Sequence, residues 1–93
     1  MACEILLVQR LRGDARHAAF AARCHGGTLR LGDVLTIAVS PEGTRHDINV
    51  TCTEIQRYEG VFADQLEENF GGRVSLEGSD EAMLSAHWTL LSG

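Results

Sequence analysis

The chain has 93 residues and a mass of 10.1 kDa, which suffices for one compact core but not two, so we expect a single domain over residues 1–93. Hydrophobic residues make up 44% and charged residues 23%, which excludes disordered and fibrous proteins. The formal net charge of −5 argues against a general nucleic-acid binder, because lysine and arginine supply nonspecific affinity for phosphates.

The first quarter of the chain contains one clear strand and one ambiguous segment. Residues 3–12 are rich in Ile, Leu and Val and end at a Gly-Asp turn signal, which predicts a strand. The alanine-rich residues 17–25 have high helix propensity, yet their alternating apolar positions also fit a strand. The pair Gly26-Gly27 follows closely, and a hairpin explains two adjacent glycines better than a helix cap does.

Residues 28–39 are expected to form two short strands separated by a turn at Gly32-Asp33. Leu29 and Leu31 share one face of the first strand. The second strand places three apolar residues on one face, namely Leu35, Ile37 and Val39.

The segment around Pro41 and Gly43 links this strand to the next, which begins at Ile48. The inward positions of that strand are Ile48, Val50 and Cys52, and the alternation then slips by one residue to Ile55. This slip predicts a β-bulge near Thr53 and Glu54.

Residues 61–70 are ambiguous, since their apolar residues have helical spacing while the flanking sequence favours sheet; helix and loop both remain open. Gly71-Gly72 ends this segment. In residues 73–78 the alternation places Val74 and Leu76 inward, and it places Arg73, Ser75 and Glu77 outward. Ser79 is a candidate cap for one helical turn through Met83, and residues 86–91 form a last strand.

About six strands at roughly ten-residue spacing, separated by glycines, indicate an all-β fold. We therefore predict a single small closed antiparallel β-barrel with at most one or two short helical turns. Closure has a physical reason, because open strand edges would pair with neighbouring molecules.

Three cysteines, Cys3, Cys24 and Cys52, are odd in number and fit no zinc or redox spacing. We interpret them as reduced packing residues of a cytoplasmic protein, because no signal peptide or membrane-length segment is present. A metal site from Cys24 and His25 is disfavoured, since adjacent strand residues point to opposite faces. No nucleophile and base form a recognisable catalytic motif, so we expect no enzyme, no metal and no cofactor.

The segments "AARCHGGTLRLGDVLTIAV", "INVTCTEIQRY", "GGRVSLEG" and "HWTLLSG" resemble, in order and spacing, the second domain of translational GTPases, above all elongation factor Tu. In particular, residues 27–33 match the family's pattern of a glycine, an apolar residue and a closing Gly-Asp. The resemblance covers residues 5–93 and implies a translation-protein β-barrel. The phosphate loop of the family's GTP-binding domain does not occur in this sequence, which excludes GTP hydrolysis by these residues.

The resemblance also implies how such a barrel works, by docking on a protein or by holding the acceptor end of tRNA. The family's acidic tRNA-contacting position after the "T-C-T" strand is Gln56 here, and Tyr58 matches a family aromatic residue. We expect a non-catalytic binding module whose partner is another protein; a translation-associated accessory that binds tRNA or ribosomal RNA is the alternative. The candidate contact residues are Arg10, Arg12, Arg16, Arg23, Gln56 and Tyr58.

Overall fold

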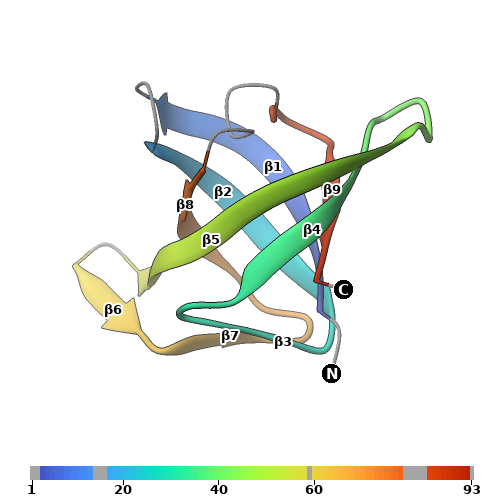
Figure 1. Ribbon diagram of the computed structural model, residues 1–93. Helices are drawn as coiled ribbons and strands as arrows, with labels where there is room; N and C mark the ends of the chain where they lie inside the picture. Colours follow the sequence, from blue (N-terminus) through green and yellow to red (C-terminus); the bar gives the residue numbers. More distant parts are fainter. Residues whose placement is uncertain (1–2, 14–16, 59, 79–83, 93) are drawn as a thin grey trace.

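The computed structural model describes residues 3–13, 17–58, 60–78 and 84–92 (Figure 1). These residues form strands and turns and no helix, so no helix long and apolar enough to cross a membrane occurs among them. The strands are β1 (Glu4–Gly13), β2 (His17–Gly26), β3 (Thr28–Arg30), β4 (Val34–Val39), β5 (Arg45–Tyr58), β6 (Val61–Ala63), β7 (Gln65–Glu67), β8 (Gly71–Glu77) and β9 (Thr89–Leu91).

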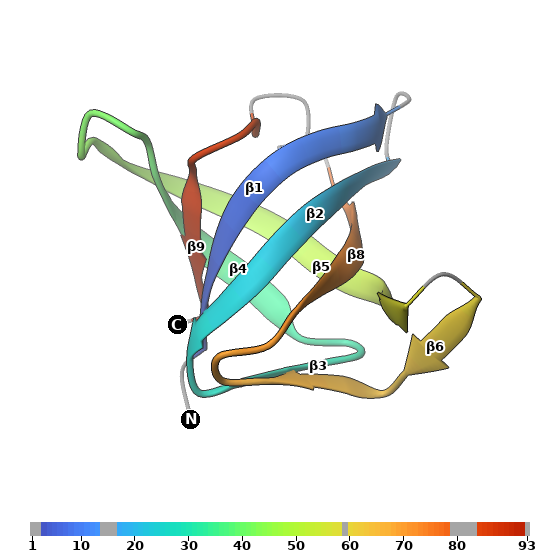
Figure 2. The same ribbon diagram turned by 180° about the vertical axis from the view of Figure 1, so that it is seen from behind.

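Six strands form a closed antiparallel ring in the order β4, β9, β1, β2, β8 and β5, because β5 also pairs with β4. The predicted closed barrel of six strands is therefore confirmed. β6 is an additional strand that pairs with the end of β5. The two ends of the chain lie side by side, where β1 pairs with β9 (Figure 2).

The barrel interior holds one apolar core built from the inward residues of the ring strands. Its largest fully buried side chain is Phe20, and fully buried Ile and Leu side chains from β1, β4, β5, β8 and β9 surround it. Burial of such side chains supplies most of the favourable free energy of folding, at about 1.5–3 kcal/mol each. The ambiguous residues 17–25 are strand, because the ring requires two neighbours for β1.

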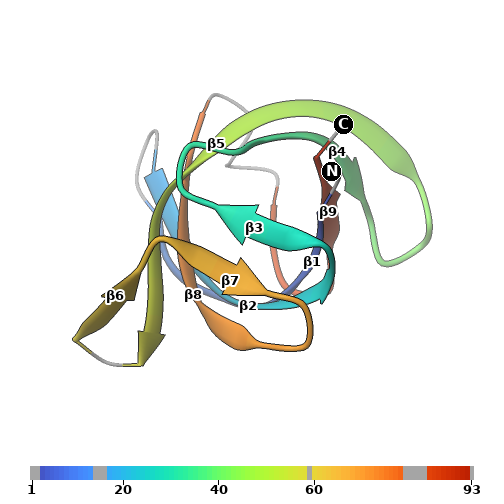
Figure 3. The same ribbon diagram turned by 90° about the horizontal axis from the view of Figure 1, so that it is seen from below.

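The small sheet of β3 and β7 covers one end of the barrel, as Figure 3 shows in the view along that end. Leu29 and Leu66 face each other in this sheet, and both are fully buried. The expected hairpin at Gly26-Gly27 is wrong, because β2 pairs with β1 and β8 while β3 pairs with β7. Gly27 instead turns the chain across the barrel end with a φ of +68°.

Residues 61–70 contain no helix; they form the two short strands β6 and β7, with a bend between them at Asp64 and a turn after Glu67. Their helical spacing is coincidental, since Leu66 is fully buried while Phe62 and Phe70 are 61% and 49% exposed. Gly71-Gly72 begins β8 and does not merely end the preceding segment. The proposed helical turn at residues 79–83 lies outside the described residues.

The β-bulge predicted in the long strand β5 is confirmed. The register against β8 shifts between Cys52 and Glu54, so Thr53 is the extra residue, and Ile55 returns to the interior. The Thr53 hydroxyl donates to the Ser75 carbonyl over 3.4 Å at this point. Ser75 was expected to lie exposed on the outer face, but it is buried.

Two further predictions, about which residues of a strand point to the core, are wrong. Leu31 lies in the turn after β3 and is 43% exposed, so it does not share a buried face with Leu29. In β4 a register shift after Leu35 makes Ala38 the next buried residue, and Ile37 and Val39 are only partly buried. The sequence alternation did not reveal this second irregularity.

Candidate functional site

Three side chains form a row across β6, β5 and β8 on the outside of the barrel. Gln56 lies opposite Phe62 of β6 on one edge and opposite Arg73 of β8 on the other. Directly opposed residues of antiparallel strands share a face, with their Cβ atoms about 5 Å apart. Phe62 is 61% exposed, Arg73 is exposed and Gln56 is partly exposed, so an aromatic ring, an amide and a guanidinium stand together.

Arg23 belongs to the same outer face. It lies opposite Gly71, while Arg73 lies opposite Ala21, so the two arginines are diagonal neighbours across β2 and β8. Diagonal neighbours are about 7–8 Å apart, within reach of long side chains. Among the described residues, neither arginine forms an ion pair with a carboxylate. The small residues opposite them leave both guanidinium groups open to solvent or to a ligand.

Arg57, the next residue of β5, ties this strand to β7 and to the segment that follows it. Its Nη2 lies 2.7 Å from Oε2 of Glu67, and its guanidinium lies 4.9 Å from the centre of the Phe70 ring. The Gln65 amide also donates to Glu67, over 3.2 Å. Sequence reasoning missed this cluster, because no local pattern links residues ten or more positions apart across two turns.

Of the remaining predicted contact residues, Arg10 points into the barrel. Its Nη1 donates to the Leu84 carbonyl over 2.8 Å, and its guanidinium lies 5.3 Å from the centre of the Phe20 ring. The structure thus brings Arg23 and Gln56 together on one face and places Arg10 elsewhere. The side chains of Arg12 and Tyr58, and all of Arg16, lie outside the described part of the chain.

β6 stands at the margin of the sheet and projects from the barrel (Figures 1 and 3). It pairs with β5 on one edge and with no described strand on the other. Val61 and Phe62 are 50% and 61% exposed, which is unusual for a strand with a free edge. The Leu31 amide donates to the Asp64 carbonyl over 3.0 Å and holds the end of β6 against the barrel.

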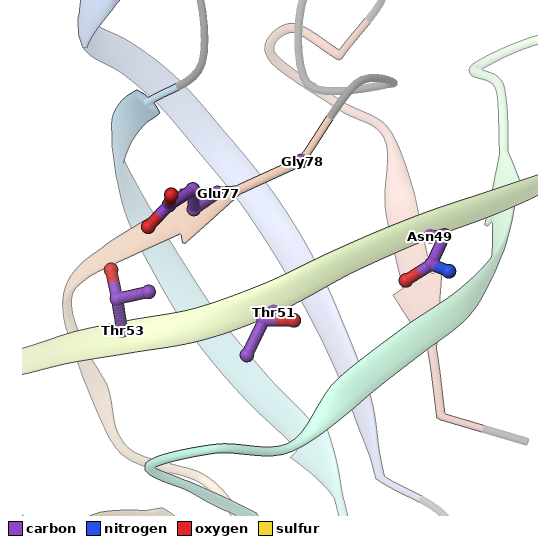
Figure 4. A pocket seen from close by; sticks show the side chains of 5 residues that line it. All are labelled: Asn49, Thr51, Thr53, Glu77 and Gly78. Atoms are coloured by element: carbon purple, nitrogen blue, oxygen red, sulfur yellow. The ribbon is translucent and has the colours of Figure 1, made fainter.

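A hollow of about 520 Å³ lies on the outer face between β5 and the end of β8 (Figure 4). The lining residues are Asn49, Thr51, Thr53, Glu77 and Gly78. These residues offer hydroxyl groups, an amide and a carboxylate, but none is a histidine, cysteine or cation. A hydroxyl nucleophile needs an adjacent general base, and the Thr53 hydroxyl instead donates to the Ser75 carbonyl.

The three cysteines are free and buried. Burial raises the pKa of Cys52 to about 12, and burial likewise raises the pKa of Cys24. Both thiols also donate weakly to nearby backbone carbonyls. Because the thiolate is the reactive form, these residues are poor nucleophiles at neutral pH. In the described part of the chain, no three metal-binding side chains converge.

Comparison of the sequence with protein-family models and with curated proteins gives no match. Comparison of the fold with solved structures finds elongation factor SelB from Methanococcus maripaludis, in the apo form and with the GTP analogue GppNHp, each with a TM-score of 0.75 and 13% identity. GDP-bound aIF5B from Aeropyrum pernix has a TM-score of 0.73 and 13% identity.

These matches cover 99% and 98% of this chain but only 19% of SelB and 14% of aIF5B. They lie on a β-barrel domain of those proteins and not on a GTPase domain. The fold of this chain therefore resembles the second, β-barrel domain of translational GTPases.

Proposed function

We propose that this chain is a non-catalytic, translation-related binding module that docks on another protein through β6 and the adjoining end of β5. The observation that carries the proposal is the pair Val61 and Phe62, which are half exposed or more on a strand with a free edge. Exposed aromatic residues beside polar and arginine side chains are typical of protein interfaces. The likeness to barrel domains of translation factors supports a binding role within translation.

A non-catalytic role also agrees with the chemistry of the described surface. In the hollow next to β5 the Thr53 hydroxyl donates to a backbone carbonyl, and the Cys24 and Cys52 thiols are held protonated by burial. Binding requires only a rigid presentation of side chains. The Arg57 cluster contributes to this rigidity by fixing the end of β5 to Glu67 of β7 and to Phe70.

A second candidate function is binding of tRNA or ribosomal RNA through the outer face. The observation that favours it is the diagonal pair Arg23 and Arg73, which continues through Gln56 to Phe62. Arginines contact phosphates, an amide contacts base edges, and an aromatic ring stacks on bases. The net charge of −5 weakens this candidate, because it repels a phosphate backbone at long range.

The test is a pull-down with the tagged protein from its own cells, with and without nuclease. If the protein-docking proposal holds, Phe62→Ser releases the captured protein, nuclease does not, and Val8→Ser has no effect. Val8 is a matched control, because it is 48% exposed on the opposite part of the sheet. Release by nuclease and by the double variant Arg23→Gln and Arg73→Gln would instead support the RNA candidate.

A further inference from the structure

We propose that β6 binds an extended protein segment as an added strand, and that this segment alternates apolar side chains with lysine or arginine. The inference rests on the proposed protein-docking function and names its partner by chemistry. It combines three observations: a free strand edge, exposed apolar side chains on that strand, and a local excess of acidic residues.

The free edge is the first observation. Each ring strand has a hydrogen-bonded neighbour on both sides, whereas β6 has β5 alone among the described strands. An unpaired strand edge presents N–H and C=O groups that another extended chain can satisfy. The strand is also held in place, since Ala63 pairs with Ile55 and the Asp64 carbonyl accepts from the Leu31 amide. An incoming segment therefore meets an ordered template.

The apolar side chains are the second observation. β6 consists of Val61, Phe62 and Ala63, and it carries no charge that would discourage pairing. Natural edge strands are usually protected by charged residues or proline, so an unprotected apolar edge is suited to a partner. Alternate residues of an added strand would face the Phe62 side of the sheet, and apolar residues there would cover its exposed ring.

The local charge is the third observation and decides the chemistry of the occupant. Residues 59–70 contain the acidic residues Glu59, Asp64, Glu67 and Glu68 and no basic residue. Glu67 is neutralised by Arg57, and Glu68 accepts from the Gly27 amide at the far end of β7, so Asp64, which is exposed directly after β6, is the carboxylate beside the strand. A carboxylate beside the free edge disfavours an acidic segment, and it disfavours a second copy of β6 that carries the same carboxylate. A segment with lysine or arginine is attracted, and its charges are complementary to Asp64 and its neighbours.

The test measures binding of a synthetic nine-residue peptide of alternating valine and lysine by fluorescence anisotropy. We expect binding that weakens at least tenfold with Phe62→Ser or Val61→Lys, two- to threefold with Asp64→Asn, and not with Val8→Ser. Amide hydrogen exchange should slow at residues 61–63 on binding. The same peptide with glutamate in place of lysine, or with a central proline, should not bind.

Equal binding of the lysine and glutamate peptides would overturn the charge argument, and unchanged exchange at residues 61–63 would overturn strand addition. The lysine peptide failing to bind at millimolar concentration would also overturn the inference. The protein-docking function is tested separately by the release of captured protein by Phe62→Ser. If Phe62→Ser releases the captured protein but the peptide does not bind, the docking face stands and strand addition is wrong. If the peptide binds but Phe62→Ser releases no protein, strand addition stands and the proposed docking function is wrong.

Carbodiimide cross-linking provides a second readout. All eight basic residues of this chain are arginines, so its side chains offer carboxylates but no amines. Cross-links from Asp64 to a captured protein therefore identify lysines of that protein. Cross-links mapped to acidic residues far from β6, such as Glu42, and absent at Asp64 would contradict the proposed position.

Discussion

The end of β8 approaches β5 so closely at Gly78 that a single added methyl group should separate the two strands. A Cβ at this position would overlap the carbonyl oxygen of Asn49 and would lie 3.1 Å from both Cα and Cγ1 of Val50. The obstructing atoms are mainly backbone, so they cannot move aside without shifting β5. We expect Gly78→Ala to lower the free energy of unfolding by about 2–3 kcal/mol, as overpacking does in rigid cores.

The two glycines at the start of β8 provide graded controls. A Cβ at Gly72 would lie 2.9 Å from the Gln56 carbonyl oxygen, whereas a Cβ at Gly71 would meet its nearest atom, the Ala22 carbonyl oxygen, at an ordinary 3.5 Å. We expect Gly72→Ala to cost about 1–2 kcal/mol. Gly71→Ala should be neutral within about 0.5 kcal/mol or slightly stabilising, because alanine restricts the unfolded chain.

The assay is urea unfolding followed by circular dichroism, together with thermal melting. For a domain of this size, 2–3 kcal/mol corresponds to a decrease in Tm of about 10–20 °C. The m-value should stay constant, so that the midpoints report stability alone. If Gly78→Ala were as stable as Gly71→Ala, β8 and β5 could not approach as closely as described, and the reasoning would be refuted.

Three further predictions concern other parts of the barrel. Arg57→Met, which removes the contacts with Glu67 and Phe70, should lower the free energy of unfolding by about 1 kcal/mol, because the ion pair is partly exposed. If this decrease is as large in 1 M NaCl as at low salt, the contacts have no electrostatic contribution. Leu66→Ala should cost about 2–5 kcal/mol in urea unfolding, because it empties a fully buried site under the barrel end; a smaller loss would mean that β7 repacks. The raised pKa of Cys52, about 12 against 9.0 when unfolded, means that the folded state holds the proton more tightly. Its stabilising effect is complete below pH 9, and the free energy of unfolding should fall between pH 9 and about 12 by about 1.4 kcal/mol per pH unit, a slope that Cys52→Ala should reduce.

The sequence predicted the barrel because strand alternation and glycine turns are local signals that survive in the folded state. The bulge at Thr53 is the clearest case, because the extra residue shifts both the apolar alternation in the sequence and the strand register in the sheet. Strand partners were harder to predict. The glycines at residues 26 and 27 indicate a corner, but only the barrel as a whole determines that β3 pairs with β7 and not with β2.

In the candidate site, too, individual residues could be predicted from the sequence, but their neighbours on adjacent strands could not. Gln56 and Arg23 were predicted as candidate contact residues from the family resemblance and from charge; they lie on one outer face, and their contacts remain a prediction. Arg73 and Phe62 join them through cross-strand register, which no sequence pattern specifies. Arg10 has the same residue type as Arg23, yet a bulge in β1 turns its side chain toward Phe20 and the interior.

The pairing of the two ends of the chain has a consequence for how the barrel forms. The Cys3 amide donates to the Ser92 hydroxyl across 89 positions of sequence, and β9 bridges β1 and β4. The ring therefore cannot close during synthesis until its last strand has left the ribosome. Non-local pairing of this kind folds on the millisecond to second timescale. During that interval β1 and β4 keep unpaired edges, so the nascent barrel is most exposed to mispairing just before its completion.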